Sequence, residues 1–236
     1  MIKQPHKAVI LLGFGSSNRS NPHDGVARPP SSADNAAVQQ AVKEALAAGL
    51  KELIFVTSDS LTPVEDQLGG FNGARAERVV IARQFAARSV GHAICGIRHL
   101  LDEEPFVLLI PEDLQGHGST ESTARMLAAY RTRGGNLVAV GDDDVLLRDG
   151  SFAAAASAPV GRYLLQPAVL DELGQDPGAG LSGALLAIAE AWPLTVLPVA
   201  QAKAALQPVV PASEAPTLRA PRPVALVAAA AAEAGD

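Results

Sequence analysis

Short apolar runs alternate with longer amphipathic segments through most of this chain, and no other sequence feature constrains its fold as strongly. The runs have the length and branched composition of buried strands, and the segments between them place apolar residues at helical spacing. Strands that alternate with helices predict a mostly parallel sheet with right-handed crossovers. The expected strands are Lys7–Leu12, Leu53–Thr57, Arg78–Ala82, Phe106–Ile110, Leu137–Val140 and Leu194–Val199. The expected helices are Ala36–Ala48, Val90–Leu101, Ser119–Arg133, Gln166–Leu173 and Leu181–Ala191.

Composition narrows the class of protein. Hydrophobic residues make up 48% of the 236 residues but aromatic residues only 4%, so we expect a core of Ala, Val and Leu. The net charge of −6 argues against a nucleic-acid partner, which needs clustered Lys and Arg. The first apolar run, Ala8–Leu12, is too short for a signal peptide or a membrane span, which favours a cytoplasmic protein and no membrane partner. The single Cys95 excludes an internal disulfide and a cysteine zinc site, and we expect it to pack in the core.

The far C-terminal part differs in composition from the rest. It is rich in Pro, Ala and Val, which is typical of segments that do not form a packed core. We therefore predict one domain over residues 1–207 and a mobile Pro/Ala-rich tail over residues 208–236.

Two segments suggest where a ligand binds. Pro111-Glu112-Asp113 follows the Phe106–Ile110 run and places two carboxylates at the carboxyl end of a buried strand. Gly13-Phe14-Gly15 follows the first strand as a glycine turn. In open α/β sheets, ligands and metals sit at the carboxyl ends of the strands. We therefore expect a pocket above the ends of the first and fourth strands.

Several segments, in order along the chain, resemble the bacterial UTP–glucose-1-phosphate uridylyltransferases. The stretch from Gly91 to Asp113 is similar to that family's G-L-G-H-A-V, D-E-P-F and L-L-P-D-D segments. Lys7–Ile10 matches its opening K-A-V-I, and Gly161-Arg162-Tyr163 matches its V-G-R-Y. Each match alone is weak, but their order and spacing over roughly residues 7–200 indicate common ancestry. The resemblance implies a three-layer α/β, nucleotidyltransferase-like fold with a Rossmann-like, mostly parallel sheet.

The resemblance also implies a set of site residues. It assigns nucleotide binding to Gly13, Gly15, Gln84, Gly91 and His92, metal binding to Glu112, and leaves Arg19 as the candidate catalytic cation. The family's metal ligand at the position of Glu112 is Asp, so the resemblance implies that Mg²⁺ binding is weak or lost. The family's catalytic lysine is absent, because no Lys occurs between Lys7 and Lys43. Its second metal carboxylate and its sugar-binding Glu are replaced as well.

Each candidate has a purely structural alternative. Gly13 and Gly15 could serve only a tight turn, and a single G-x-G is weak evidence for a nucleotide. Gln84 could be a solvated residue after a strand, and His92 could cap or pack a helix. Glu112 and Asp113 could be an ordinary acidic pair at a helix start.

Three hypotheses for function follow. The leading one is a divergent, catalytically impaired relative of these uridylyltransferases that binds a uridine nucleotide or nucleotide sugar, and that could form a homo-oligomer or regulate an active paralogue. The second is an active enzyme that makes UDP-glucose, in which Arg19 and Glu112 replace the missing groups. The third is a non-catalytic protein-interaction module.

Overall fold

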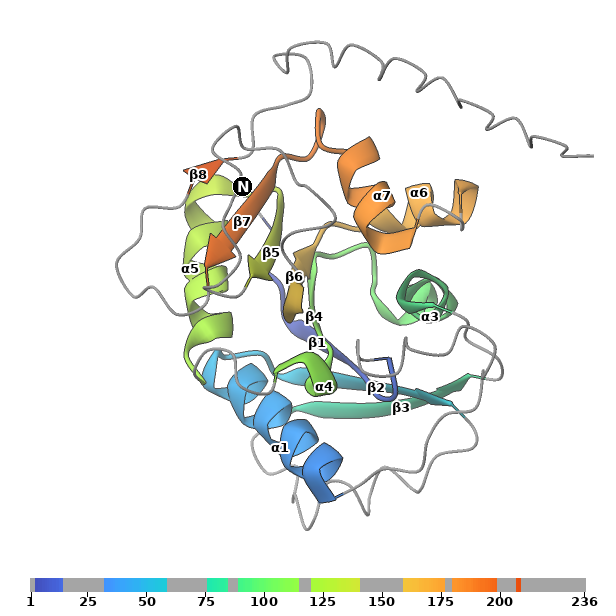
Figure 1. Cartoon of the computed structure of the whole chain (residues 1–236), viewed down its shortest axis with the longest axis vertical. Helices are drawn as coiled ribbons and strands as arrows, with labels where there is room; N and C mark the ends of the chain where they lie inside the picture. The colour runs from blue at the N-terminus through green and yellow to red at the C-terminus, as the bar shows by residue number, and fades with distance from the viewer. Residues whose placement is uncertain are drawn as a thin grey trace, which may run out of the picture.

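A computed structural model describes residues 3–14, 32–58, 76–84, 89–114, 120–140, 159–176, 180–198 and 207–208. They form one sheet flanked by helices on both sides (Figure 1). The sheet has eight strands in the order β3-β2-β1-β4-β6-β5-β7-β8. Their bounds are β1 Lys7–Leu11, β2 Glu52–Ser58, β3 Arg78–Gln84, β4 Phe106–Leu109, β5 Asn136–Val140, β6 Pro159–Leu165, β7 Leu194–Pro198 and β8 Gln207–Pro208.

Six of these strands run in the same direction. β1 pairs in parallel with β2 and β4, β2 with β3, and β5 with β7. β6 runs antiparallel to both β4 and β5, and β8 runs antiparallel to β7. The carboxyl ends of β1 to β4 therefore meet at one edge of the sheet, as the sequence predicts.

The helices divide into two layers. Helices α1 and α5 cover one face, and α3, α6 and α7 cover the other (Figure 1). The helices and helical turns are α1 Ser32–Ala47, α3 Val90–Gly96, η2 Arg98–Leu100, α4 Pro111–Leu114, α5 Ser122–Arg133, α6 Ala168–Gln175 and α7 Gly180–Ala187. This arrangement confirms the three-layer α/β fold.

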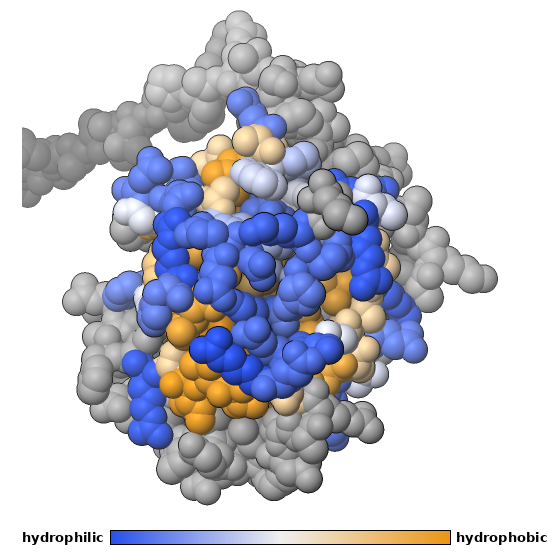
Figure 2. Space-filling model, turned by 180° about the vertical axis from the view of Figure 1, so that it is seen from behind, coloured by the Kyte–Doolittle hydropathy of each residue, from blue (hydrophilic) through white to orange (hydrophobic). Residues whose placement is uncertain are grey.

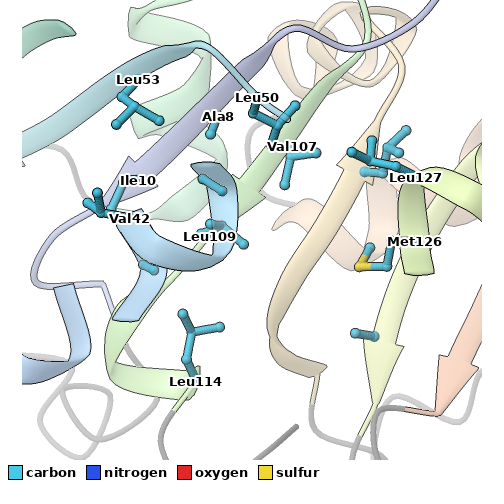
Figure 3. Close-up of a cluster of buried hydrophobic side chains, with 14 of the residues drawn as sticks. Ala8, Ile10, Val42, Leu50, Leu53, Val107, Leu109, Leu114, Met126 and Leu127 are labelled. Atoms are coloured by element: carbon cyan, nitrogen blue, oxygen red, sulfur yellow. The ribbon is translucent and has the colours of Figure 1, made fainter. Parts of the chain in front are cut away.

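The parallel strands bury alternate residues against the two layers. On the α1 side, Ala8 and Ile10 of β1 belong to one buried cluster with Leu109 of β4, Val42 of α1 and Met126 of α5 (Figure 3). On the other side, the intervening residues of β1 and β4 pack against α3, α6 and α7. The first strand is fully buried on both faces, which explains its continuous apolar sequence. These core residues are mainly aliphatic, as the low aromatic content predicts.

Most expected elements are present, with shifted ends. The expected helix over Val90–Leu101 is instead the short α3 followed by the 3₁₀ turn η2. The expected helix over Leu181–Ala191 ends at Ala187 and continues as turns. Gly49 ends α1 in the left-handed conformation with φ +86°, as a C-terminal cap should. Cys95 is half-buried against the α6 side rather than fully enclosed.

The sequence did not predict strand β6, which lies in the middle of the sheet. It contains Pro159, Gly161 and Arg162, residue types that rarely occupy a central strand. Proline is at the first position, where a strand tolerates it, and the arginine is paired inside the protein. Tertiary contacts therefore outweigh the local sequence signal.

A buried ionic network joins β6 to the α1 layer. Arg162 and Glu44 are both fully buried. Arg162 donates from Nε to Glu44 Oε1 at 2.7 Å and from Nη2 to Oε2 at 3.0 Å. Thr123, in the first turn of α5, donates to Glu44 Oε1 from its N–H at 3.1 Å and its hydroxyl at 2.7 Å. One carboxylate of α1 thus holds β6 and the start of α5 together.

In the part of the chain that the structure describes, no helix has the length and apolar character needed to cross a membrane. The proposed tail, apart from Pro208, lies outside the described residues, and the division at residue 207 stays a prediction.

Candidate functional site

The carboxyl ends of β1 and β4 bring Gly13 and Glu112 together. Gly13 follows β1 with φ +86°, a conformation that favours glycine. Its N–H donates a hydrogen bond of 2.6 Å to Glu112 Oε1. Glu112 lies in the turn α4, directly after β4. The structure therefore joins two residues that are 99 positions apart and that the sequence assigns to one site.

Strand β6 sets the position of the α4 turn. Ile110 donates from its N–H to the Gly161 carbonyl at 2.8 Å. Gly161 has φ +67°, and a Cβ there would lie 2.6 Å from the Ile110 carbonyl oxygen and 2.9 Å from Asp113 Cβ. A side chain at residue 161 would therefore push the turn that carries Glu112. The sequence indicates Gly161 only as part of the Gly161-Arg162-Tyr163 motif, and the contact with the α4 turn has no local sequence signal.

Gly91 and His92 lie in the first turn of α3. Ser89 caps this helix, since its hydroxyl accepts the His92 N–H at 3.1 Å. The His92 side chain is exposed. Gly91 is buried, and a Cβ there would lie 2.8 Å from Leu173 Cδ2 of α6. Close packing of α3 on α6 is thus sufficient to explain the glycine at residue 91.

Gln84 is the last residue of β3 and pairs in register with Ser58 of β2. It therefore ends at the same sheet edge as Gly13, with β2 between their strands. Gly15 and Arg19 lie outside the described residues, and their predicted roles remain predictions.

Glu112 and Asp113 both lie in the α4 turn that follows β4, and the metal-ligand role is assigned to Glu112. One of its oxygens already accepts the Gly13 N–H. Among the residues that the structure describes, no three His, Cys, Asp or Glu side chains are grouped to hold a metal. Mg²⁺ in nucleotide enzymes is commonly held by one or two carboxylates together with substrate phosphates. The described side chains do not by themselves form a Mg²⁺ site. An ion bound here would need further oxygen ligands from a bound nucleotide, and it would bind the same carboxylate of Glu112 that already accepts the Gly13 N–H.

Comparison with known proteins identifies relatives of one kind, although no family model matches the chain. It is 27% identical over 193 residues to the UTP–glucose-1-phosphate uridylyltransferase of Pseudomonas aeruginosa, covering 61% of this chain and 68% of that protein. It is 27% identical over 123 residues to the enzyme of the same name from Haemophilus ducreyi, covering 42% of each. The chain is a remote homologue of these uridylyltransferases. The matched segments span between 42% and 68% of these two relatives' lengths.

Solved structures agree on the fold. A UTP-bound UGPase from Acinetobacter baumannii matches with a TM-score of 0.58 and 20% identity, over 85% of this chain and 87% of that one. A protein described as a glucose-1-phosphate thymidylyltransferase from Bacillus anthracis matches with a TM-score of 0.62 and 12% identity, over 81% and 86% of the two chains. The chain thus has the nucleotidyltransferase-like architecture.

Proposed function

We propose that this chain is a uridylyltransferase-like protein that binds a uridine nucleotide or nucleotide sugar weakly and has lost most of its catalytic power. The ligand would occupy the carboxyl ends of β1 and β4, the position that open α/β sheets use for ligands. The homologous uridylyltransferases and the UTP-bound structural relative support the choice of ligand.

The hydrogen bond between Gly13 and Glu112 is the observation that carries this proposal. A glycine N–H after the first strand is suited to approach an anionic ligand, but here it donates to a carboxylate. Glutamate is one methylene longer than the aspartate that the family resemblance implies at this position. The longer side chain lets the carboxylate reach the Gly13 backbone, where it competes with a phosphate for the same donor.

The loss of cations supports the same conclusion. Phosphoryl-type transfer depends on positive groups placed around the transferring phosphate, and each such donor is worth roughly 10²–10³ in rate. The sequence has no Lys between Lys7 and Lys43. Turnover should therefore be far below that of an ordinary enzyme, whose turnover number is about 1 s⁻¹ or more.

Calorimetric titration of the full chain with UTP, UDP and UDP-glucose, with and without Mg²⁺, tests the binding. We expect weak binding to the wild type and tighter Mg²⁺-dependent binding to Glu112→Asp, because the shorter side chain no longer reaches Gly13. Glu112→Ala should keep the fold and lose the Mg²⁺ dependence. The neighbouring carboxylate provides the matched control: Asp113→Ala should bind like the wild type.

Three outcomes would contradict the proposal in different ways. Pyrophosphate release from UTP and glucose-1-phosphate at about 1 s⁻¹ or faster would show an active enzyme. The absence of any heat with all three nucleotides at millimolar concentration would favour an interaction protein. Loss of Mg²⁺-dependent binding in Asp113→Ala but not in Glu112→Ala would mean that the wrong carboxylate is assigned.

A further inference from the structure

The segment that joins α7 to β7 carries exposed apolar side chains. Leu186 is 45% exposed and Trp192 is 40% exposed. Apart from Glu190, every residue from 186 to 193 is apolar and at least partly exposed. The Trp192 N–H donates to the Ile188 carbonyl at 2.8 Å, which winds this stretch into turns and keeps its side chains close together. Residues 186–193 therefore form one apolar surface, the α7–β7 patch.

The α7–β7 patch lies far from the candidate functional site. It comes directly before β7, so it is at the amino end of that strand. β7 runs in the same direction as β1 and β4, whose carboxyl ends hold Gly13 and Glu112. On the face shown in Figure 2, a small group of apolar residues lies near the top of the described part, the level of α7 in Figure 1. Exposed apolar surface of this kind usually marks a contact with another segment or molecule.

The chain comes back to the α7–β7 patch as it leaves β8. β8 pairs antiparallel with β7, with Gln207 opposite Val196 and Pro208 opposite Thr195. The backbone therefore leaves β8 toward the amino end of β7, where Trp192 and the rest of the patch lie. The remainder of the chain thus starts beside this surface.

The last part of the sequence is strongly apolar. Val224–Ala232 is a run of nine Ala, Val and Leu residues, and no other apolar run in the sequence is as long. Ala and Leu favour helices, and Gly235 follows the run as the residue type that commonly ends them. A helix that is apolar on all sides requires a surface that covers it. The sequence of this run therefore calls for an apolar partner.

The segment between β8 and this run is suited to be a connection. Residues 209–223 include four prolines and no comparable apolar run. These fifteen residues span up to about 45 Å when extended at about 3.1 Å per residue, which is ample for a return to the α7–β7 patch. Arg222 comes just before the run, and its charge is opposite to that of the exposed Glu190 in the patch.

We propose that Val224–Ala232 folds back as a helix and packs on the α7–β7 patch of its own chain, where it covers Leu186 and Trp192. Both apolar surfaces gain by leaving water. A connection of this length gives the run an effective concentration on the order of millimolar at the patch, which favours it over the run of a second copy. The mobile segment that the composition predicts is then residues 209–223 alone.

The single tryptophan of the sequence lies in the patch, so its fluorescence tests the contact in the full chain. In the wild type, Trp192 should emit at short wavelength and resist quenching by acrylamide. The double variant Leu226→Asp/Val227→Asp should shift the emission to longer wavelength and raise quenching, because unpaired carboxylates are not tolerated in an apolar contact. Leu218→Asp, in the connection, is the matched control and should behave as the wild type does.

Hydrogen exchange tests the same contact from the other side. The backbone amides of Val224–Ala232 should be protected in the wild type and should lose this protection in Leu186→Asp. Leu186 is exposed, so its substitution leaves the core intact, and a thermal melt checks this. Val79→Asp, at an exposed valine of β3, is the matched control and should keep the protection.

Both signals should be independent of protein concentration, because the contact is made within one chain. A wild type whose Trp192 is quenched as readily as in Leu226→Asp/Val227→Asp would overturn the proposal, and so would unprotected amides in the run. Protection that appears only as the concentration rises would assign the contact to a second copy. Protection that persists in Leu186→Asp would place the run on another surface.

Discussion

Glu44→Gln should be among the most destabilising conservative substitutions in this chain, although it only replaces one carboxylate oxygen by an NH₂ group. Glu44 is fully buried and accepts four hydrogen bonds, two from Arg162 and two from Thr123. Glutamine keeps the shape and can still accept from Thr123. It has no charge to balance the guanidinium, however, and its NH₂ group faces another donor.

The expected cost follows from the geometry. Removing one partner of a buried ion pair leaves an uncompensated charge and costs about 3–5 kcal/mol in free energy of unfolding. For a chain of this size each kcal/mol lowers the melting temperature by about 2–4 °C, so Glu44→Gln should melt roughly 6–20 °C below the wild type. Glu121→Gln is the control, because Glu121 forms an exposed pair with Arg125 four residues away on α5. Such pairs contribute only about 0.3–0.5 kcal/mol.

A double-mutant cycle in urea identifies the cause. Arg162→Met removes the charge that Glu44→Gln leaves unbalanced, so the double variant should be more stable than Glu44→Gln alone. The two effects should therefore be far from additive. If Glu44→Gln lowers the free energy of unfolding by less than about 1 kcal/mol, or if the two effects simply add, the pair does not have the role assigned to it.

Other predictions concern backbone and charge. Gly161→Ala should destabilise the protein more than Gly49→Ala in thermal melts, because both residues have positive φ but only residue 161 lacks space for a Cβ; equal losses would contradict this. Lys7 holds the pKa of Asp102 below its usual range through a hydrogen bond and its charge. The ionised carboxylate therefore stabilises the folded protein above the pKa of Asp102 in the unfolded chain, and this stabilisation is lost as the pH falls through the lowered pKa of the folded state. The difference in free energy of unfolding between the wild type and Asp102→Asn should vanish in acid, and a difference that stays constant with pH would refute this. Burial raises the pKa of the Cys95 thiol, so alkylation at neutral pH should be slow in the native protein and fast in urea.

The sequence predicts the parallel part of the sheet well because apolar runs and helical spacing are local signals. It also predicts that Gly13 and Glu112 share a site, since the ends of parallel strands meet at one edge. It does not reveal that the two residues bond to each other, because that depends on the reach of one side chain. β6 was missed for a related reason: Arg162 is compatible with a central strand only when Glu44, 118 positions earlier, is brought beside it.

The position of β6 also limits how this chain can be divided. It is the one described strand between β1–β4 on one side and β5, β7 and β8 on the other, and it hydrogen-bonds to both β4 and β5. A fragment that stops before Pro159 would leave β4 and β5 without their shared neighbour and Glu44 without its counter-ion. The halves of the sheet should therefore not fold as separate units, and a growing chain should complete its core only after β6 has been synthesised. A cut between β5 and β6 would yield two pieces that need each other to fold.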